Sequence, residues 1–182
     1  MIKNFTLKII KKIKSKKIKI GVIGLGYVGL PLALLMAKKG YLVYGYDIDK
    51  TKISLLKKKK SYLERISNHD IKNIFKKKNF FSNFDTIDQC DIIVICVPTP
   101  LKKNKYPNLD YIKNTISFIK RKLRYNQVLI LESTSYPGTT RDLIIKKLPK
   151  ELIVGTNFFV GFSSERINPG ENEKFISKIP KV

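Results

Sequence analysis

The segment GVIGLGYVGLPLA, from Gly21 to Ala33, places four glycines within nine residues and then continues into leucine and alanine. Gly24, Gly26 and Gly29 have the spacing G-x-G-x-x-G. An apolar run typical of a buried strand precedes them, and an apolar pattern typical of a helix follows, from Val28 to Lys39. Two structures fit this segment: a tight strand-to-helix corner without a ligand, or a turn that holds a phosphate group.

Beyond this segment, short apolar runs alternate with stretches of helical spacing. Such alternation is typical of parallel strands joined by crossover helices. We therefore predict an α/β fold with a Rossmann-like, doubly wound, mainly parallel sheet. The predicted strands are 17–24, 41–47, 91–98, 127–133 and 157–161, and the predicted helices are 28–39, one or two within 51–78, 109–124 and one that begins after Pro137 and Gly138.

Length and hydrophobicity indicate one well-formed core, because the chain has 182 residues of which 43% are hydrophobic. We predict a leading basic helix at 1–16 and one domain over 17–182. Phe5, Ile9 and Ile13 share one face of that helix, which packs on its own domain or lies on a membrane surface, and we expect the first. The sequence has no apolar run of roughly 18 to 20 residues and no signal-peptide pattern, so we expect a cytoplasmic protein without a membrane partner.

The net charge of +23 is carried almost entirely by lysine, with 32 Lys and 5 Arg, beside 26 Ile, 2 Ala and no Trp. Nucleic-acid interfaces favour the bidentate arginine side chain, whereas an AT-rich coding sequence would produce this bias over the whole surface. We therefore expect no specific nucleic-acid partner, and we interpret the runs Lys57–Lys60 and Lys76–Lys78 as solvated helix ends and loops. A basic nucleic-acid-binding protein is the alternative.

Both cysteines, Cys90 and Cys96, lie in or beside the apolar run CDIIVICV. On one strand they would be about 20 Å apart, too far for a disulfide, which suits a reducing compartment. A catalytic thiol at Cys96 is the alternative to a small buried strand residue, and we expect the buried residue. His69, in the polar segment SNHD, is expected to be a solvated loop residue, and we predict no metal site.

Asp47 supports the interpretation of the glycine segment as a binding turn. It ends the second predicted strand, 21 residues after Gly26, where an acidic side chain can bind the 2′-hydroxyl of a nucleotide ribose. Gly24 would make the tight turn, Gly26 would let the backbone approach a pyrophosphate, and Gly29 would let helix and strand pack closely. A carboxylate at position 47 favours NAD over NADP, although Lys52 would reduce its repulsion of the extra phosphate.

Two more polar turns follow predicted strands. CVPTPL, from Cys96 to Leu101, and ESTSYPGTT, from Glu132 to Thr140, both come at the carboxyl end of a strand, where open α/β sheets bind ligands. Thr99, between Pro98 and Pro100, can present its hydroxyl to a cofactor. One such turn indicates only a rigid corner, but three in corresponding places indicate a binding site.

Four segments, GLGYVGLPLA, CVPTPL, STSYPGTT and SSERINPG, together resemble the UDP-glucose/GDP-mannose dehydrogenase family in their order and spacing. The resemblance covers roughly residues 15 to 182. It implies a cytosolic enzyme that oxidises the C6 hydroxymethyl group of a nucleotide sugar to a carboxylate with two NAD, in surface polysaccharide biosynthesis. The start KSKKIKIGVIGLGYVGLPLA and the segment ERINPG are more similar to the branch that oxidises UDP-N-acetylhexosamines, such as UDP-N-acetylglucosamine.

The resemblance implies a role for each matching position. The turn around the pyrophosphate would consist of Gly24, Gly26, Tyr27, Val28 and Gly29. Asp47 would bind the adenosine ribose, with Lys52 nearby. The nicotinamide side would be lined by Pro98, Thr99 and Thr134, and the Thr134 hydroxyl would also order a water molecule. Glu165 would act in proton transfer with water beside C6 of the sugar.

The chain departs from the family pattern in three places. Ser164 stands where proline is usual, and Asn108 stands where aspartate is common, so the geometry of those loops is not carried over. Pro169 replaces a second glutamate of the UDP-glucose branch, which agrees with the hexosamine branch.

The resemblance also implies a domain that the 182 residues lack, because they stop before the family's central helix and sugar-binding domain. The family's nucleophilic cysteine and its lysine partner belong to that later half, and full-length members form homodimers. Oxidation in two steps needs covalent capture of the aldehyde, so we expect this chain to bind NAD without completing the reaction. The alternatives are a non-catalytic remnant or split-gene product, and a dehydrogenase of 2- or 3-hydroxy acids, which CVPTPL and STSYPGTT disfavour.

Overall fold

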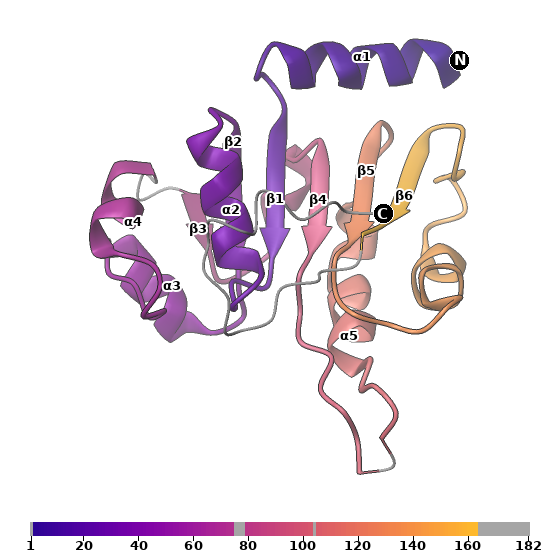
Figure 1. The fold of residues 1–182 in the computed structure, drawn as a ribbon. Coiled ribbons are helices and arrows are strands. Elements are labelled where there is room, and N and C mark those ends of the chain that lie inside the picture. Colours follow the sequence, from indigo (N-terminus) through magenta and orange to yellow (C-terminus); the bar gives the residue numbers. More distant parts are fainter. Residues whose placement is uncertain (1, 75–78, 104, 164–182) are drawn as a thin grey trace.

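The computed structural model describes residues 2–74, 79–103 and 105–163, and a parallel sheet forms the centre of this part of the chain (Figure 1). The strand order is β3-β2-β1-β4-β5-β6, and every pairing between these strands is parallel. The strands are β1 (Lys19–Ile23), β2 (Leu42–Tyr46), β3 (Phe80–Phe81), β4 (Ile92–Ile95), β5 (Gln127–Leu131) and β6 (Phe158–Phe162). The order reverses direction between β1 and β4, which confirms the predicted doubly wound, Rossmann-like fold.

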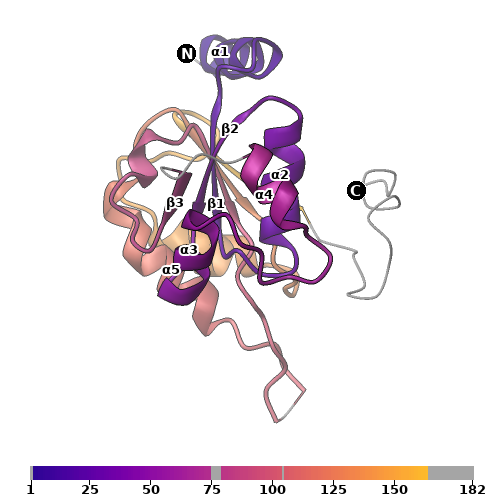
Figure 2. The same cartoon turned by 90° about the vertical axis from the view of Figure 1, so that its left-hand side faces the viewer.

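Helices cover both faces of the sheet, with α2 and α4 on one side and α5 on the other (Figure 2). The helices are α1 (Ile2–Lys14), α2 (Gly29–Lys38), α3 (Lys50–Lys57), α4 (Asn68–Ile74) and α5 (Asp110–Ile119). Shorter helical turns are η2 (Ile87–Gln89), η3 (Lys120–Lys122), η4 (Thr140–Ile144) and η5 (Ile145–Lys147). The sheet is therefore buried between two helical layers, as all-parallel sheets require.

The alternation of side chains along β4 divides the core into two clusters. Val94 and Cys96 join the cluster that contains Leu30 of α2, while Ile93 and Ile95 join the cluster that contains Ile116 of α5. Successive residues of a strand point to opposite faces, so an uninterrupted apolar run is required wherever both faces are covered. The run IIVIC therefore has no polar position.

Three local predictions differ from the structure. The strand β3 was not predicted, because two residues are too short to have a recognisable period. The segment after Gly138 forms a wide π-helical turn followed by a 3-10 turn instead of a regular helix. His69 lies on α4 and not in a loop, although its side chain is exposed as expected. Predictions for Lys76–Lys78 and for the tail that contains Glu165 fall outside the described residues.

The helix α1 lies across the amino ends of the strands (Figure 1). Ile9 and Ile13 pack against the core, and Lys12 Nζ donates a hydrogen bond to Asp91 Oδ1 at 2.7 Å. Asp91 is buried and also accepts the Lys19 N–H at 3.0 Å. Burial raises the pKa of Asp91, but the Lys12 and Lys19 hydrogen bonds outweigh burial, so the pKa lies below its ordinary value. An ion pair between half-buried Lys12 and buried Asp91 thus joins α1 to the residue that precedes β4.

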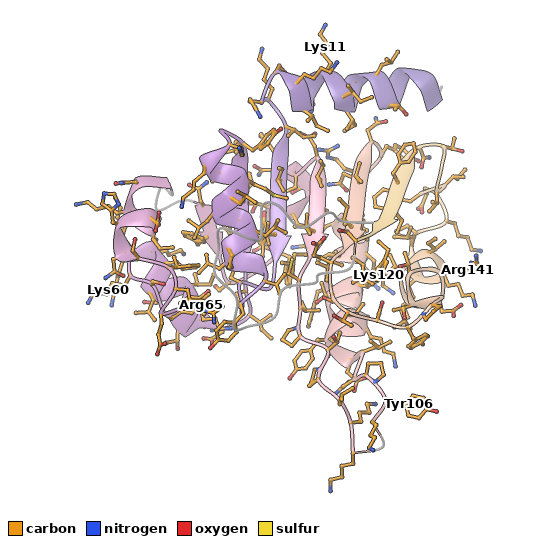
Figure 3. All side chains as sticks on the ribbon, viewed as in Figure 1. Lys11, Lys60, Arg65, Tyr106, Lys120 and Arg141 are labelled. Atoms are coloured by element: carbon orange, nitrogen blue, oxygen red, sulfur yellow. The ribbon has the colours of Figure 1, made fainter. Side chains whose placement is uncertain are left out.

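We expect Lys12→Gln to lower the free energy of unfolding by about 1 to 2 kcal/mol at neutral pH, between the values for exposed and buried ion pairs. Because the folded-state pKa of Asp91 is depressed, this stabilisation is present above the ordinary carboxyl pKa and disappears as the pH falls through the folded-state pKa. Urea unfolding at neutral and acidic pH measures both effects. Lys11→Gln is the control, since Lys11 is exposed on the same helix (Figure 3); an equal loss in the two variants would exclude the ion pair as the cause.

Both cysteines are buried, and neither forms a disulfide within the described residues. The Cys90 Sγ lies 3.7 Å from the Tyr46 hydroxyl, and burial raises the pKa of Cys90 to about 11. At neutral pH that thiol is therefore protonated and a poor nucleophile. Cys96 follows β4 and is 8% exposed. No helix among the described residues is long and apolar enough to cross a bilayer.

Candidate functional site

Three turns begin at the same level along the carboxyl edge of the sheet. The glycine turn follows β1, the segment from Cys96 follows β4, and the segment from Glu132 follows β5. The backbone hydrogen-bond ladder continues into the first residue of each turn, with Gly24 N–H to Tyr46 O at 2.8 Å, Cys96 N–H to Ile23 O at 2.8 Å and Glu132 N–H to Ile95 O at 2.9 Å. Parallel register therefore brings together three segments that are far apart in the sequence, at the point where the strand order reverses.

Each glycine of the first turn meets a different steric demand. Gly24 has a φ of +87°, which side chains rarely adopt, and a Cβ there would lie 2.7 Å from the Cys96 carbonyl oxygen. A Cβ on Gly29 would overlap the Gly24 carbonyl oxygen and lie 3.1 Å from Cys96 Cβ. A Cβ on Gly26 would meet no atom within 4 Å. The first and third glycines are thus required by the fold, whereas Gly26 leaves open space.

Asp47 holds the glycine turn through its carboxylate. Asp47 Oδ2 accepts the Leu25 N–H at 2.8 Å, and Asp47 Oδ1 accepts the Asp49 N–H at 2.9 Å. The carboxylate is buried, and Lys52 Nζ lies 3.7 Å from Oδ2. A carboxylate has about four lone-pair positions, so these bonds leave acceptor capacity for a ribose hydroxyl. Asp49, the neighbouring acid, caps α3 by accepting the Thr51 and Lys52 N–H groups.

The glycine turn also contacts Tyr62, which lies in the connection between α3 and α4. The Tyr62 hydroxyl donates a hydrogen bond to the Leu25 carbonyl oxygen. Lys52 Nζ lies 5.8 Å from the centre of the Tyr62 ring, within the range of a cation–π contact. Burial, followed by the negative charges of Asp47 and Asp49, raises the pKa of Tyr62, so its hydroxyl remains a donor at neutral pH.

A serine connects the other two turns. Ser133 Oγ donates a hydrogen bond to the Val97 carbonyl oxygen at 2.7 Å. This bond holds the segment after β5 against the segment after β4. Thr134, the next residue, is exposed, and Thr99 is half-buried.

A cleft of about 510 Å³ lies between these segments. It brings together seven of the predicted site residues: Gly26, Tyr27, Val28, Lys52, Pro98, Thr99 and Thr134. Gly24, Gly29 and Asp47 do not line the cleft. The two glycines allow the close packing of the turn, and Asp47 accepts a hydrogen bond from the backbone of the turn. Glu165 lies outside the described residues.

Six lining residues were not predicted as cofactor-binding residues: Tyr62, Leu63, Cys96, Val97, Glu132 and Ser133. Four of them belong to the two polar turns, whose motifs could have indicated them. No local pattern marks Tyr62 or Leu63. Within the described residues, no group of three His, Cys, Asp or Glu side chains is arranged to hold a metal ion.

The cleft fits the pyrophosphate of a dinucleotide. Gly26 lines it and leaves the space that a methyl group would fill. The helix α2 begins at Gly29, and Val28 at its N-cap makes no side-chain cap hydrogen bond. Leu30 N–H donates to the Gly26 carbonyl oxygen at 3.1 Å and Pro31 has no N–H, so an anion would face the N–H groups that precede Leu30. Such a helix terminus attracts an anion, and Lys52 adds a positive charge to the lining.

The strand order, the glycine turn and the cleft at the switch point define a dinucleotide-binding domain of the kind found in dehydrogenases. The model for the NAD-binding domain of the UDP-glucose/GDP-mannose dehydrogenase family matches residues 18–182. The chain therefore belongs to the UDP-glucose/GDP-mannose dehydrogenase family, and the matching region is its NAD-binding domain.

Curated relatives agree with this assignment. The chain is 36% identical over 169 residues to a UDP-N-acetyl-D-glucosamine 6-dehydrogenase from Pseudomonas aeruginosa, covering 92% of this chain and 40% of that protein. It is 32% identical over 160 residues to a UDP-N-acetyl-D-mannosamine dehydrogenase from Pyrococcus horikoshii, covering 84% of this chain and 37% of that protein. The chain thus spans about two fifths of the length of these relatives.

Solved structures of nucleotide-sugar dehydrogenases also match this chain. A UDP-D-ManNAc dehydrogenase from Pyrococcus horikoshii matches with a TM-score of 0.78 at 30% identity, covering 88% of this chain and 38% of that one. A GDP-mannose dehydrogenase from Pseudomonas aeruginosa, solved as a ternary complex, matches with a TM-score of 0.74 at 27% identity, covering 87% and 38%. The family and cofactor expected from the sequence motifs are therefore confirmed.

Proposed function

We propose that this chain is the NAD-binding half of a nucleotide-sugar 6-dehydrogenase that acts on a UDP-N-acetylhexosamine. The observation that carries the proposal is the cleft in which the glycine turn meets the turns after β4 and β5. NAD bound there would accept a hydride from C6 of the sugar. UDP-N-acetylglucosamine is our first candidate substrate, and UDP-N-acetylmannosamine, which the names of other relatives specify, is the second.

The residues of this chain would hold the oxidant and orient it. Gly26, Tyr27 and Val28 would face the pyrophosphate, and Asp47 with Lys52 would bind the adenosine ribose. Pro98, Thr99 and Thr134 would contact the nicotinamide half, with the Thr134 hydroxyl available to position a water molecule. Glu165 would transfer a proton, with water, beside C6 of the sugar.

Turnover would need a sugar-binding region, which would lie in the part of the relatives that this chain does not cover. The matching family model is that of the NAD-binding domain alone. Cys90 is buried as a protonated thiol, and Cys96, although it lines the cleft, is 8% exposed and belongs to the core cluster. We therefore propose that capture of the aldehyde takes place on residues outside these 182. A homodimer and a cytoplasmic location belong to the same proposal.

The proposal is tested by mixing the chain with NAD and each of the two UDP-sugars and recording the near-ultraviolet absorbance of NADH. Calorimetry should detect NAD binding, and NADH should not form. NADH formation by the chain alone would contradict the proposal that oxidation of the sugar needs residues outside these 182. Absence of NAD binding would contradict the function of the cleft.

The net charge of +23 is carried mostly by lysine, which supports an origin in overall composition and not in a nucleic-acid site. Lys11, Lys60 and Arg141 lie on separate parts of the surface (Figure 3) and form no single patch. The absence of a nucleic-acid partner stays a prediction. A steep salt dependence of DNA binding that survives mutation of Asp47 would contradict it.

We expect Asp47→Asn to weaken NAD binding by about tenfold or more, since hydrogen bonds to a charged group contribute about 1.5 to 3 kcal/mol. Loss of the negative charge should also reduce the discrimination against NADP. Calorimetric titration with both cofactors measures the two effects separately.

Asp49→Asn is the matched control for this substitution. Asparagine caps helices about as well as aspartate, so α3 and NAD binding should be unchanged. An amide at position 47 can accept only one of the two N–H groups that the carboxylate now accepts. If Asp47→Asn weakened NAD and NADP binding equally, Asp47 would support the turn without selecting the cofactor.

A further inference from the structure

Leu25, in the middle of the glycine turn, has both of its backbone polar groups bound by side chains. The Asp47 carboxylate accepts the Leu25 N–H at 2.8 Å, and the Tyr62 hydroxyl donates to the Leu25 carbonyl oxygen. The Leu25 side chain is fully buried. The backbone at this position is therefore fixed from two directions and from the core.

The Tyr62 hydrogen bond determines the orientation of the next peptide group. The carbonyl of Leu25 and the N–H of Gly26 belong to one planar trans peptide and point in opposite directions. Holding the carbonyl toward Tyr62 therefore sets the direction of the Gly26 N–H. Gly26 lines the cleft together with Tyr27 and Val28, and a Cβ on Gly26 would meet no atom within 4 Å.

The loop that presents Tyr62 is itself held in place. Ser61 N–H donates to Asn68 Oδ1 at 2.7 Å, and Ser61 Oγ donates to the Leu63 carbonyl oxygen at 2.9 Å. Leu63 and Ile66 are buried in the core cluster. Hydrogen bonds and core packing therefore order the loop from which Tyr62 reaches the glycine turn. Tyr62 also lines the cleft, beside Lys52.

We propose that Tyr62 is a positioning residue, which orients the Gly26 N–H for the pyrophosphate of the dinucleotide by holding the Leu25 carbonyl. This inference rests on the proposed binding of NAD in the cleft. The residue acts through the backbone of the turn and takes no part in the chemistry. A donor oriented before the ligand arrives avoids the free-energy cost of ordering it on binding.

Tyr62→Phe removes one hydroxyl oxygen and tests the proposal. We expect the dissociation constant for NAD to rise by about three- to tenfold, the effect of one hydrogen bond of typical strength. Tyr125→Phe is the matched control, because Tyr125 is exposed and does not line the cleft. Its affinity for NAD should equal that of the wild type.

The amide NMR resonance of Gly26 separates positioning from general destabilisation. In the ligand-free Tyr62→Phe variant it should shift, while the resonances of Gly155 and Gly161 stay in place. If the variant binds NAD as tightly as the wild type and the Gly26 resonance is unmoved, the inference is wrong. If the wild type itself does not bind NAD, the proposed function is wrong.

A second measurement needs no variant. Cofactor and Tyr62 stabilise the same turn, so by linkage NAD must also stabilise the contact between Tyr62 and Leu25. Adding NAD to the wild-type chain should therefore slow hydrogen exchange of the backbone at 61–66 as well as at 24–29. Slowing at 24–29 alone would overturn the role of Tyr62.

Discussion

Gly26→Ala is expected to weaken NAD binding by about 100-fold or more in a chain that remains as stable as the wild type. A Cβ at this position meets no atom within 4 Å, and the backbone of Gly26 is not left-handed, so the folded chain accommodates alanine. The new methyl group fills the space through which the pyrophosphate would approach the backbone. If the pyrophosphate is thereby kept from two backbone N–H groups of the turn, at about 1.5 to 3 kcal/mol for each bond, binding weakens by about 100-fold or more.

Calorimetric titration with NAD and thermal unfolding measure the two properties of the Gly26→Ala variant. Gly161→Ala is the matched control, because a Cβ on Gly161 makes only an ordinary contact, 3.9 Å from Ile130, and Gly161 is distant in sequence from the turn. The control should bind NAD normally. A Gly26→Ala variant that binds NAD with wild-type affinity would show that the pyrophosphate does not approach this turn.

Gly29→Ala, three residues further on, should give the opposite result, a chain with greatly reduced stability. Its Cβ would overlap the Gly24 carbonyl oxygen, which is backbone and cannot rotate away. Overpacking of a core costs about 1 to 3 kcal/mol and sometimes more, and we expect about 3 kcal/mol or more here. At about 2 to 4 °C for each kcal/mol, the melting temperature should fall by about 6 to 12 °C or more.

Thermal unfolding of Gly29→Ala beside Gly26→Ala tests this difference within one motif. The first and third glycines of the motif, Gly24 and Gly29, allow α2 to start directly against β1, whereas Gly26 lines the cleft. A Gly29→Ala variant that melts at the wild-type temperature would contradict this packing.

Much of the fold could be predicted because the core of a parallel sheet constrains sequence strongly. Ile93 and Val94 face opposite helical layers, so their strand must be apolar throughout, and that run is visible without a structure. The strand β3 could not be predicted, because Phe80 and Phe81 extend an edge by two residues and have no period.

The candidate site was predictable where it depends on motifs and not where it depends on tertiary contact. Gly26 and Thr134 belong to turns that follow strands, and parallel register brings those turns together. Tyr62 reaches the Leu25 carbonyl from a loop 37 positions away, and no spacing rule connects the two. Asp47 was predicted as a ribose ligand, but its bond to the Leu25 N–H also makes it part of the turn.

The central claim, that the cleft binds NAD, is tested most directly by titrating the wild-type chain with NAD and following its amide NMR resonances. We predict saturable shifts for residues that line the cleft, including Gly26, Thr99 and Thr134, and none for Lys11 or Tyr125. The absence of saturable shifts would contradict the account. A separate pocket is lined by Arg121, Tyr125 and Leu152. Saturable shifts that cluster there instead would also contradict NAD binding in the cleft.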